Sequence, residues 1–313
     1  MELQVIVEQM AMLFAMMLAG VWIWKLGWFD ESAYQKLSKV VVNLLNPILV
    51  LYGVMGKEAS GSVRLLLINL GFVLGFYLLL ILAACLFLVL LHPSRESRDL
   101  YRLMTIFPNV GFMGIPVITS IFGTESMIYI VFYMLVYNLL LYTYGLILAQ
   151  RAAGHGQKEA GSSRTSQWKR MVNPGVLSSV AAVILFLSKP EIPTPVVNFC
   201  DYMGNATIPL SMLLIGMSIA KVSPASMLSN RKIYWYTFLK MLALPIAAIL
   251  LLKPFPVDKT LFGIFALELA MPVGSIVTLV AKEYGADETI CTNGIVISTL
   301  ASIATIPIVC MFL

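Results

Sequence analysis

The chain has 313 residues, of which 59% are apolar and 12% charged, and its formal net charge is +5. Soluble domains carry roughly 25% charged residues, so this composition excludes an ordinary soluble protein and indicates a polytopic membrane protein in a lipid bilayer. The excess of Lys and Arg lies between apolar runs, where it reports membrane topology, and no nucleic-acid partner is expected.

Ten apolar runs follow one another, and a helix that crosses a bilayer needs ~20 residues. The acidic residues Glu2 and Glu8 stand where a signal peptide would have basic ones, so we expect the first run to be a retained helix. We predict an all-α protein with ten transmembrane helices. Because the sixth run is short and the third long, counts of eight or nine stay open. The runs are 5–24, 40–55, 65–91, 103–122, 127–149, 174–188, 196–220, 233–252, 260–281 and 290–313.

The connections between these runs differ in charge. With the N-terminus outside, fifteen of the 21 Lys and Arg residues lie in the inner connections and five in the outer ones, while Lys240 lies within a helix. Basic residues favour the cytoplasmic side. We therefore expect a multi-pass protein of the plasma or inner membrane with both termini extracytoplasmic.

The two halves of the chain align at one offset of 162 residues, the separation of Asn43 and Asn205. This offset also superposes Pro47 on Pro209 and the run 108–113 on 270–275. We predict two five-helix repeats, 1–151 and 163–313, joined by a cytoplasmic connector at 152–162. Since each repeat holds an odd number of helices, the second must be inverted relative to the first.

The fourth and ninth helices are interrupted at matching places, at 107–116 and 269–275. Proline removes a helical hydrogen bond, and unwound backbone at membrane depth must line a cavity or be buried in protein. A pair of such breaks in two repeats marks a transporter's binding site, and half-helix N-termini favour an anion such as a carboxylate. The alternative is a pair of packing kinks, since Pro and Gly are common in membrane helices.

These breaks supply the predicted substrate-binding residues. Asn109 is the first candidate, because its amide offers donors to a carboxylate and an acceptor to a hydroxyl. The other candidates at the breaks are Pro108, Val110, Gly111, Gly114, Met271, Pro272, Gly274 and Ser275.

Three asparagines accompany the N-x-x-x-P pattern of the second and seventh helices, Asn43, Asn46 and Asn205. A proline four residues after an Asn leaves that carbonyl without its usual donor. Two interpretations stay open: these residues line the same cavity, or they hydrogen-bond neighbouring helices.

Lys240 and Glu268 are ionisable residues inside predicted helices, which makes them functional candidates. Our hypothesis is that they pair, or that Lys240 attracts the anion while Glu268 takes and releases a proton. A snorkelling Lys and a structural ion pair are the alternatives. No cofactor, metal site or disulfide is expected, because the histidines lie in loops and the cysteines are scattered at Cys85, Cys200, Cys291 and Cys310.

The motif Asn109-x-Gly111-x-x-Gly114-x-Pro116, the helix with Asn43 and Pro47, and the helix from Pro209 to Gly216 resemble the auxin efflux carrier family. This family includes plant PIN-formed auxin exporters and bacterial permeases for malonate and malate. The resemblance implies a five-plus-five inverted repeat with helices 4 and 9 crossing, as in bile-acid symporters and sodium/proton antiporters. It also implies an elevator-like motion, a homodimer, and substrate binding at Asn109 and at the Pro108 and Pro272 breaks.

The chain departs from its relatives in two ways. It lacks the long cytoplasmic loop of many plant exporters, which favours a bacterial permease, and it has no acidic residue within 107–118 or 269–279, unlike the antiporters with their aspartate pair. We expect a carrier that exports small carboxylates, such as an auxin-like acid, malate or malonate, by alternating access. A sodium- or proton-coupled symporter and an anion channel stay open, while an enzyme is not expected.

Overall fold

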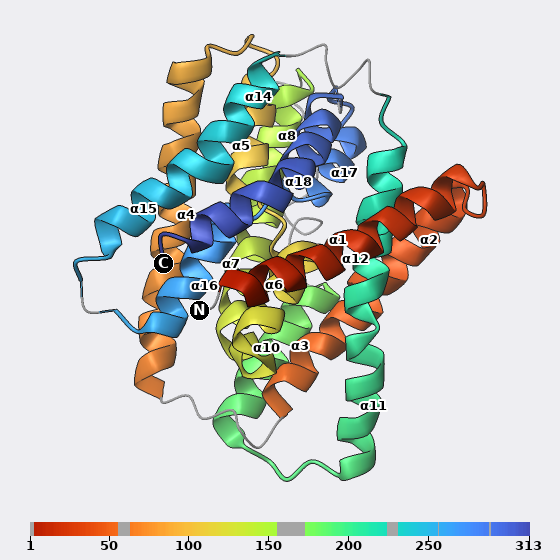
Figure 1. Cartoon of the computed structure of the whole chain (residues 1–313), viewed down its shortest axis with the longest axis vertical. Helices are drawn as coiled ribbons and strands as arrows, with labels where there is room; N and C mark the ends of the chain where they lie inside the picture. Colours follow the sequence, from red (N-terminus) through yellow and green to blue (C-terminus); the bar gives the residue numbers. More distant parts are fainter. Residues whose placement is uncertain (1–2, 56–62, 155–172, 224–230, 256, 288) are drawn as a thin grey trace. The chain divides into compact units, whose positions relative to one another are not determined.

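The computed structural model describes residues 3–55, 63–154, 173–223, 231–255, 257–287 and 289–313, and their regular elements are helices (Figure 1). The predicted connector at 152–162 falls largely outside these residues. The η segments are π turns, except η3, which is a 3₁₀ turn. In chain order the elements are α1 (Leu3–Lys25), α2 (Glu31–Val40), η1 (Val41–Leu45), α3 (Asn46–Met55), α4 (Val63–Leu91), α5 (Arg98–Ile106), η2 (Val110–Gly114), α6 (Ile115–Phe122), η3 (Thr124–Ser126), α7 (Met127–Leu140), η4 (Leu141–Gly145), α8 (Leu146–Ala152), α10 (Pro174–Ser188), α11 (Thr194–Asn205), α12 (Thr207–Ala220), α14 (Arg231–Phe238), η6 (Leu239–Ala243), α15 (Leu244–Leu252), α16 (Lys259–Ala270), α17 (Ile276–Glu283) and α18 (Thr289–Cys310).

Seven helical stretches in the described part of the chain are long and apolar enough to cross a bilayer, which confirms an all-helical, multi-pass membrane protein. The other three predicted runs form shorter helices, because two of them are split by breaks and α10 has 15 residues. The count of ten therefore stays a prediction. The seven stretches are Val7–Lys25, Glu31–Met55, Arg64–Leu91, Thr124–Ala152, Thr194–Ala220, Arg231–Leu252 and Thr289–Cys310.

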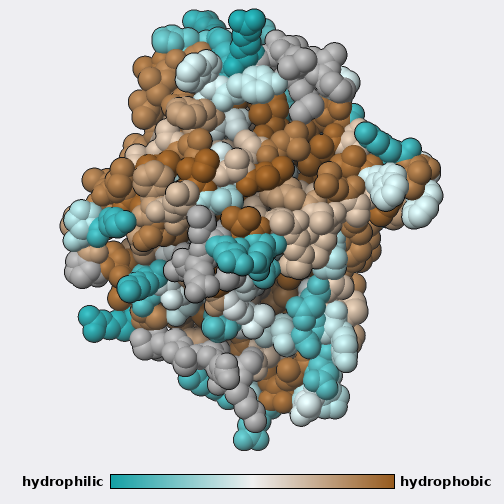
Figure 2. Space-filling view, in the orientation of Figure 1, coloured by the Kyte–Doolittle hydropathy of each residue, from teal (hydrophilic) through white to brown (hydrophobic). Residues whose placement is uncertain are grey.

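A stripe of exposed leucines runs along α4. Leu74, Leu78, Leu82, Leu86 and Leu90 are spaced four residues apart, and each is more than half exposed. A spacing of four places them on one face of the helix. Soluble proteins rarely expose such a continuous apolar surface, so this face fits contact with lipid, and brown apolar residues cover much of the view in Figure 2.

Three prolines explain three of the π turns. Pro47, Pro116 and Pro245 each stand two residues after a π turn, at η1, η2 and η6. A proline lacks the N–H and its ring clashes with the carbonyl four residues earlier. The extra residue of a π turn relieves that clash without ending the helix. One carbonyl that loses its donor in this way, that of Phe112, accepts a hydrogen bond from Ser211 Oγ at 3.3 Å.

The chain forms two compact units, and each draws on both halves of the sequence. The first unit comprises Met1–Gly71, Gly111–Asn138 and Val172–Lys221. The second unit comprises Phe72–Val110, Leu139–Met171 and Val222–Leu313.

Close helix contacts without side chains between them hold the first unit together. A Cβ at Gly20 of α1 would lie 2.2 Å from the Leu213 carbonyl oxygen of α12, and one at Gly216 would lie 1.9 Å from the Met17 carbonyl oxygen. Glycine allows this approach because it has no Cβ. Helices α1 and α12 are thus packed backbone to backbone.

Aromatic rings position the two interrupted helices of the second unit. The rings of Tyr101 on α5 and Tyr236 on α14 meet edge to face, with centroids 5.4 Å apart. Phe265 on α16 packs in the same way against Phe72 and Phe76 of α4, at 5.6 and 6.0 Å. Helices α5 and α16 therefore each have a fixed neighbour just before their chains unwind.

Candidate functional site

The two predicted breaks lie side by side in the second unit. Helix α5 ends at Ile106 and α16 ends at Ala270, and each resumes as a helix a few residues later. Between the helical parts, Pro108 and Val273 form an antiparallel β-bridge. Two extended segments from distant parts of the sequence are thus paired like two short strands.

Proline explains where each helix ends. The residue before a proline is disfavoured in the helical region and adopts an extended conformation. Met271, before Pro272, has φ −65° and ψ 142°, and Phe107, before Pro108, has φ −115° and ψ 77°. Both helices therefore end two residues before their proline, at Ile106 and Ala270.

Hydrogen bonds within the unit satisfy much of the unwound backbone. The Asn109 N–H donates to the Pro272 carbonyl at 2.8 Å, and the Gly274 N–H donates to the Phe107 carbonyl at 2.9 Å. The Val273 N–H donates to Ser298 Oγ on α18 at 3.0 Å. These partners replace the water that a bilayer cannot supply, so the crossing does not need a ligand to satisfy these groups.

A buried lysine completes the crossing. Lys240, in η6, has no exposed surface, and its Nζ donates to the Met271 carbonyl. Glu268, on the last turn of α16, is also fully buried, and neither of its carboxyl oxygens has a hydrogen-bond partner in the structure. Lys240 therefore bonds the break and not the carboxyl group with which the sequence hypothesis paired it, and its lack of exposure shows that it does not snorkel.

The remaining candidates of the second unit are buried, apart from one. Asn109 is 4% exposed and Val110 is 1% exposed. Ser275, at the start of α17, is half-buried and is the candidate of the second unit with the most accessible side chain. The other buried candidates are Pro108, Met271, Pro272 and Gly274.

The first unit holds Gly111 and Gly114 together with the three asparagines. Asn46 is 7% exposed, and its Nδ2 lies 3.6 Å from the position of a Cβ on Gly111, so the two residues are neighbours. Its Oδ1 has no hydrogen-bond partner in the structure. Asn43 and Asn205 are exposed and donate within their own helices, to the Lys39 carbonyl and to Asp201.

The structure adds Ser298 to the residues that the sequence indicated. Ser298 is fully buried on α18 and accepts from the unwound segment. The sequence signal was weak, because a serine in an apolar run usually hydrogen-bonds its own helix. Ser298 reaches the Val273 N–H because of the way α18 is aligned with the break, and this alignment is not visible in the sequence.

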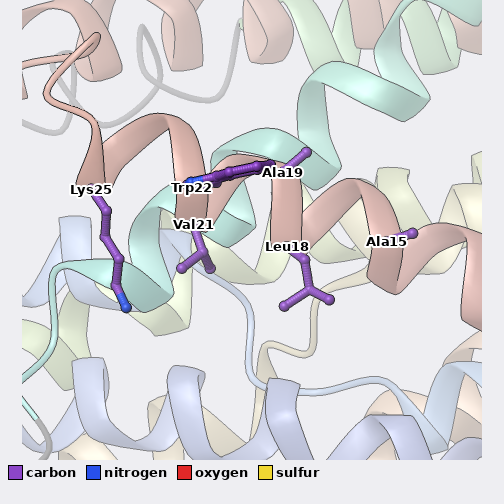
Figure 3. A pocket seen from close by; sticks show the side chains of 6 residues that line it. All are labelled: Ala15, Leu18, Ala19, Val21, Trp22 and Lys25. Carbon is purple, nitrogen blue, oxygen red and sulfur yellow. The ribbon is translucent and has the colours of Figure 1, made fainter.

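A hollow beside α1 is lined by residues of that helix. It has a volume of about 560 Å³, and Figure 3 shows Leu18, Val21 and Lys25 pointing to one side of the helix. A second hollow of about 810 Å³ is lined by the ends of α3 and α10 and the start of α11. Neither includes a residue of the breaks, so neither is part of the candidate site.

A family model described as "Membrane transport protein" matches residues 5–310. The chain belongs to this family. It is the auxin efflux carrier family that the sequence motifs resemble, so that prediction is confirmed. Membership makes the protein a membrane transporter, and such transporters are typically not enzymes.

Two relatives are similar to this chain over much of their length. An "Uncharacterized transporter" of Methanothermobacter thermautotrophicus is 24% identical over 311 residues, which are 96% of each chain. A "Putative malonate transporter" of Rhizobium meliloti is 23% identical over 206 residues, 64% of this chain and 62% of that protein.

Proposed function

We propose that the protein is a secondary carrier of small organic anions, in particular carboxylates, and that the anion binds where the breaks after α5 and α16 cross. The observation that carries this proposal is the antiparallel pairing of Pro108 with Val273, with the Lys240 ammonium bonded to the adjacent Met271 carbonyl. It joins unwound backbone and a buried positive charge at one place. An intramembrane ionisable residue of this kind is a functional candidate by default.

The chemistry of the crossing supports an anionic ligand. A helix N-terminus carries partial positive charge on its free N–H groups, and α17 begins directly after the second break, at Ile276. Asn109 and Ser275 supply neutral polar groups beside it. A carboxylate accepts hydrogen bonds from such donors and offsets the Lys240 charge. We propose Val110 as a further lining residue.

The architecture that we propose has ten transmembrane helices in two inverted repeats, 1–151 and 163–313. The composition of the first unit supports it, because α1 and α10 are equivalent at the 162-residue offset, and so are α3 and α12. Both pairs fall in the same unit. The second unit, which carries the paired breaks, is then the moving part in alternating access.

Malonate is the first substrate to test, since the Rhizobium meliloti relative is named for it. We propose export as the direction, because moving one negative charge outward gains about 2.3 kcal/mol per 100 mV of inside-negative potential. Saturable exchange of labelled malonate in liposomes supports a carrier, whereas unsaturated flux at channel rates contradicts it.

A thermal-shift screen of the purified protein against malonate, malate, aromatic acids and their neutral amides tests the ligand class. We expect carboxylates to stabilise the protein. Asn109→Ala should weaken their apparent affinity at least about tenfold, because it removes a charge-assisted hydrogen bond to the ligand. Asn198→Ala, on an exposed position of α11, is the matched control and keeps the wild-type response. Stabilisation by neutral amides alone contradicts an anion site.

A further inference from the structure

The buried Lys240 side chain interacts with two groups at the end of α16, the Met271 carbonyl and the Glu268 carboxyl group. Lys240 donates to the Met271 carbonyl, and the Met271 N–H donates to the Glu268 carbonyl at 3.2 Å. Glu268 therefore stands on the same turn, three residues before Met271. Its carboxyl group and the Lys240 ammonium interact electrostatically. The ammonium is bonded to the carbonyl in the structure.

The surroundings of Glu268 fit a carboxyl group that holds a proton. The side chain has no exposed surface, and both oxygens lack a hydrogen-bond partner. A buried carboxylate without hydrogen bonds is strongly disfavoured, whereas a neutral carboxyl group loses much less by the same burial. The arrangement with Lys240 on the Met271 carbonyl is therefore the arrangement expected for protonated Glu268.

Few other groups can influence this carboxyl group. Helix α16 packs against η6, α15 and α18, and Phe265 brings in the part of α4 that belongs to the second unit. Lys240 is the one Asp, Glu, Lys, Arg or His in these elements, while α14, packed against η6, adds Arg231 and Lys232 at its start. The other titratable side chains of these elements are Tyr77, Cys85, Tyr234, Tyr236, Cys291 and Cys310.

We propose that Glu268 is a proton-binding site, and that its protonation state decides whether Lys240 stays bonded to the break between α16 and α17. With Glu268 protonated, the ammonium stays on the Met271 carbonyl. When the carboxyl group gives its proton to water, the resulting carboxylate is the stronger acceptor, because both partners are then charged. Lys240 moves to Glu268, and the Met271 carbonyl loses its donor.

The consequence for transport rests on the proposed function. Protonated Glu268 leaves the Lys240 charge uncompensated and favours an anion at the crossing, whereas ionised Glu268 cancels that charge. Linkage is reciprocal, so the anion and the proton favour each other's binding. The carrier then moves a carboxylate together with a proton, and Glu268 is the residue that couples them. A dianion such as malonate keeps one negative charge when it moves with one proton, as the proposed export requires.

Infrared difference spectroscopy tests the proton site without any substrate. At neutral pH we expect the reconstituted wild type to show the carbonyl-stretching band of a protonated carboxylic acid, and Glu268→Gln to lack it. Glu283→Gln, at an exposed position of α17, is the matched control and keeps the band. A neutral-pH spectrum without a Glu268-dependent band overturns the proposal.

Amide hydrogen exchange in the wild type tests whether Lys240 stabilises the break, and this test needs no variant. As pH rises, loss of the infrared band and faster exchange at 271–275 are expected over the same pH range, after correction for the intrinsic pH dependence of exchange. Exchange that stays constant while the band disappears overturns the link between Glu268 and the break.

Malonate exchange in liposomes tests the coupling. Between about pH 6 and about pH 8 we expect the wild-type rate to fall about fivefold or more, the lower end of site-to-site coupling, while Glu268→Gln keeps a flat profile. Glu283→Gln follows the wild type. A Glu268→Gln variant with the wild-type pH profile overturns the coupling. If no variant exchanges malonate but the Glu268 band is present, the proposed substrate fails and the proton site stands.

Discussion

Single side chains replace the water that the unwound backbone of the crossing cannot reach. Ser298 accepts a hydrogen bond from the Val273 N–H, and Lys240 donates one to the Met271 carbonyl. Each side chain therefore satisfies a backbone group that has no helical hydrogen-bond partner. An unsatisfied backbone group in a bilayer is costly. Loss of either side chain is therefore expected to lower stability more than loss of a surface residue of the same type.

Replacement of Ser298 by Ala removes the acceptor of a buried N–H. We expect a loss of about 1–3 kcal/mol in the free energy of unfolding, because the donor stays buried without a partner. Ser188→Ala, where the exposed hydroxyl bonds the Ile184 carbonyl of its own helix, serves as control and changes stability little. Thermal unfolding in detergent checks both, and equal melting temperatures for the two variants contradict the role of Ser298.

Asp287 stabilises the start of α18 in a pH-dependent way. Hydrogen bonds from the Thr289 side chain and backbone lower the pKa of Asp287, and the backbone bond measures 3.0 Å. A lowered pKa means that the contribution is complete above the ordinary value of about 3.9 and is lost as pH falls through the lowered value. Asp287→Ala is expected to cost about 0.5 kcal/mol at pH 7, since the group is exposed. Unfolding at neutral and strongly acidic pH checks it, and a difference that grows on acidification contradicts it.

At the scale of elements, local signals in the sequence located most helices. The predicted run 174–188 has the bounds of α10, because Asn173 caps its first turn and Pro174 suits its first position. Hydropathy does not predict α2, because Glu31–Val40 is amphipathic and contains several charged residues. The predicted run therefore begins at residue 40, whereas the helical stretch begins at Glu31.

The contact of α1 with α12 depends on glycine. A methyl group at Gly216 would overlap the backbone of α1, so Gly216→Ala should separate the helices and lower stability by about 1–3 kcal/mol, as overpacking does. Gly75→Ala on α4 is the matched control, because a Cβ there meets nothing within 4 Å. Thermal unfolding distinguishes them, and a Gly216→Ala protein as stable as Gly75→Ala contradicts the close packing.

At the scale of the whole molecule, the charge pattern predicts an orientation in the membrane. With the N-terminus outside, the connection at Lys189 faces outward and the end of α17 at Lys282 faces the cytoplasm. We expect Lys189→Cys in intact cells to react with a membrane-impermeant thiol reagent and Lys282→Cys to react only after permeabilisation. The wild type, in which Cys85 is exposed and Cys200, Cys291 and Cys310 are buried, measures the background. Labelling in the reverse order would show the opposite topology.

The sequence by itself determined the membrane class, the positions of most helices and the sites of both breaks. These features follow from hydropathy and from the missing N–H of proline. Both act locally, over a few residues of the chain. The repeat offset brought 108–113 and 270–275 into correspondence before any contact was known.

Only the tertiary structure decided which side chains serve the breaks. The sequence could not show that Ser298 bonds Val273, that Lys240 bonds Met271 in place of Glu268, or that Asn46 alone of the three asparagines lies beside Gly111. Such partners come from helices far apart in the chain. Whether they meet depends on the rotation and register of the packed helices. Hydropathy is nearly uniform along a membrane helix, so it encodes neither the rotation nor the register.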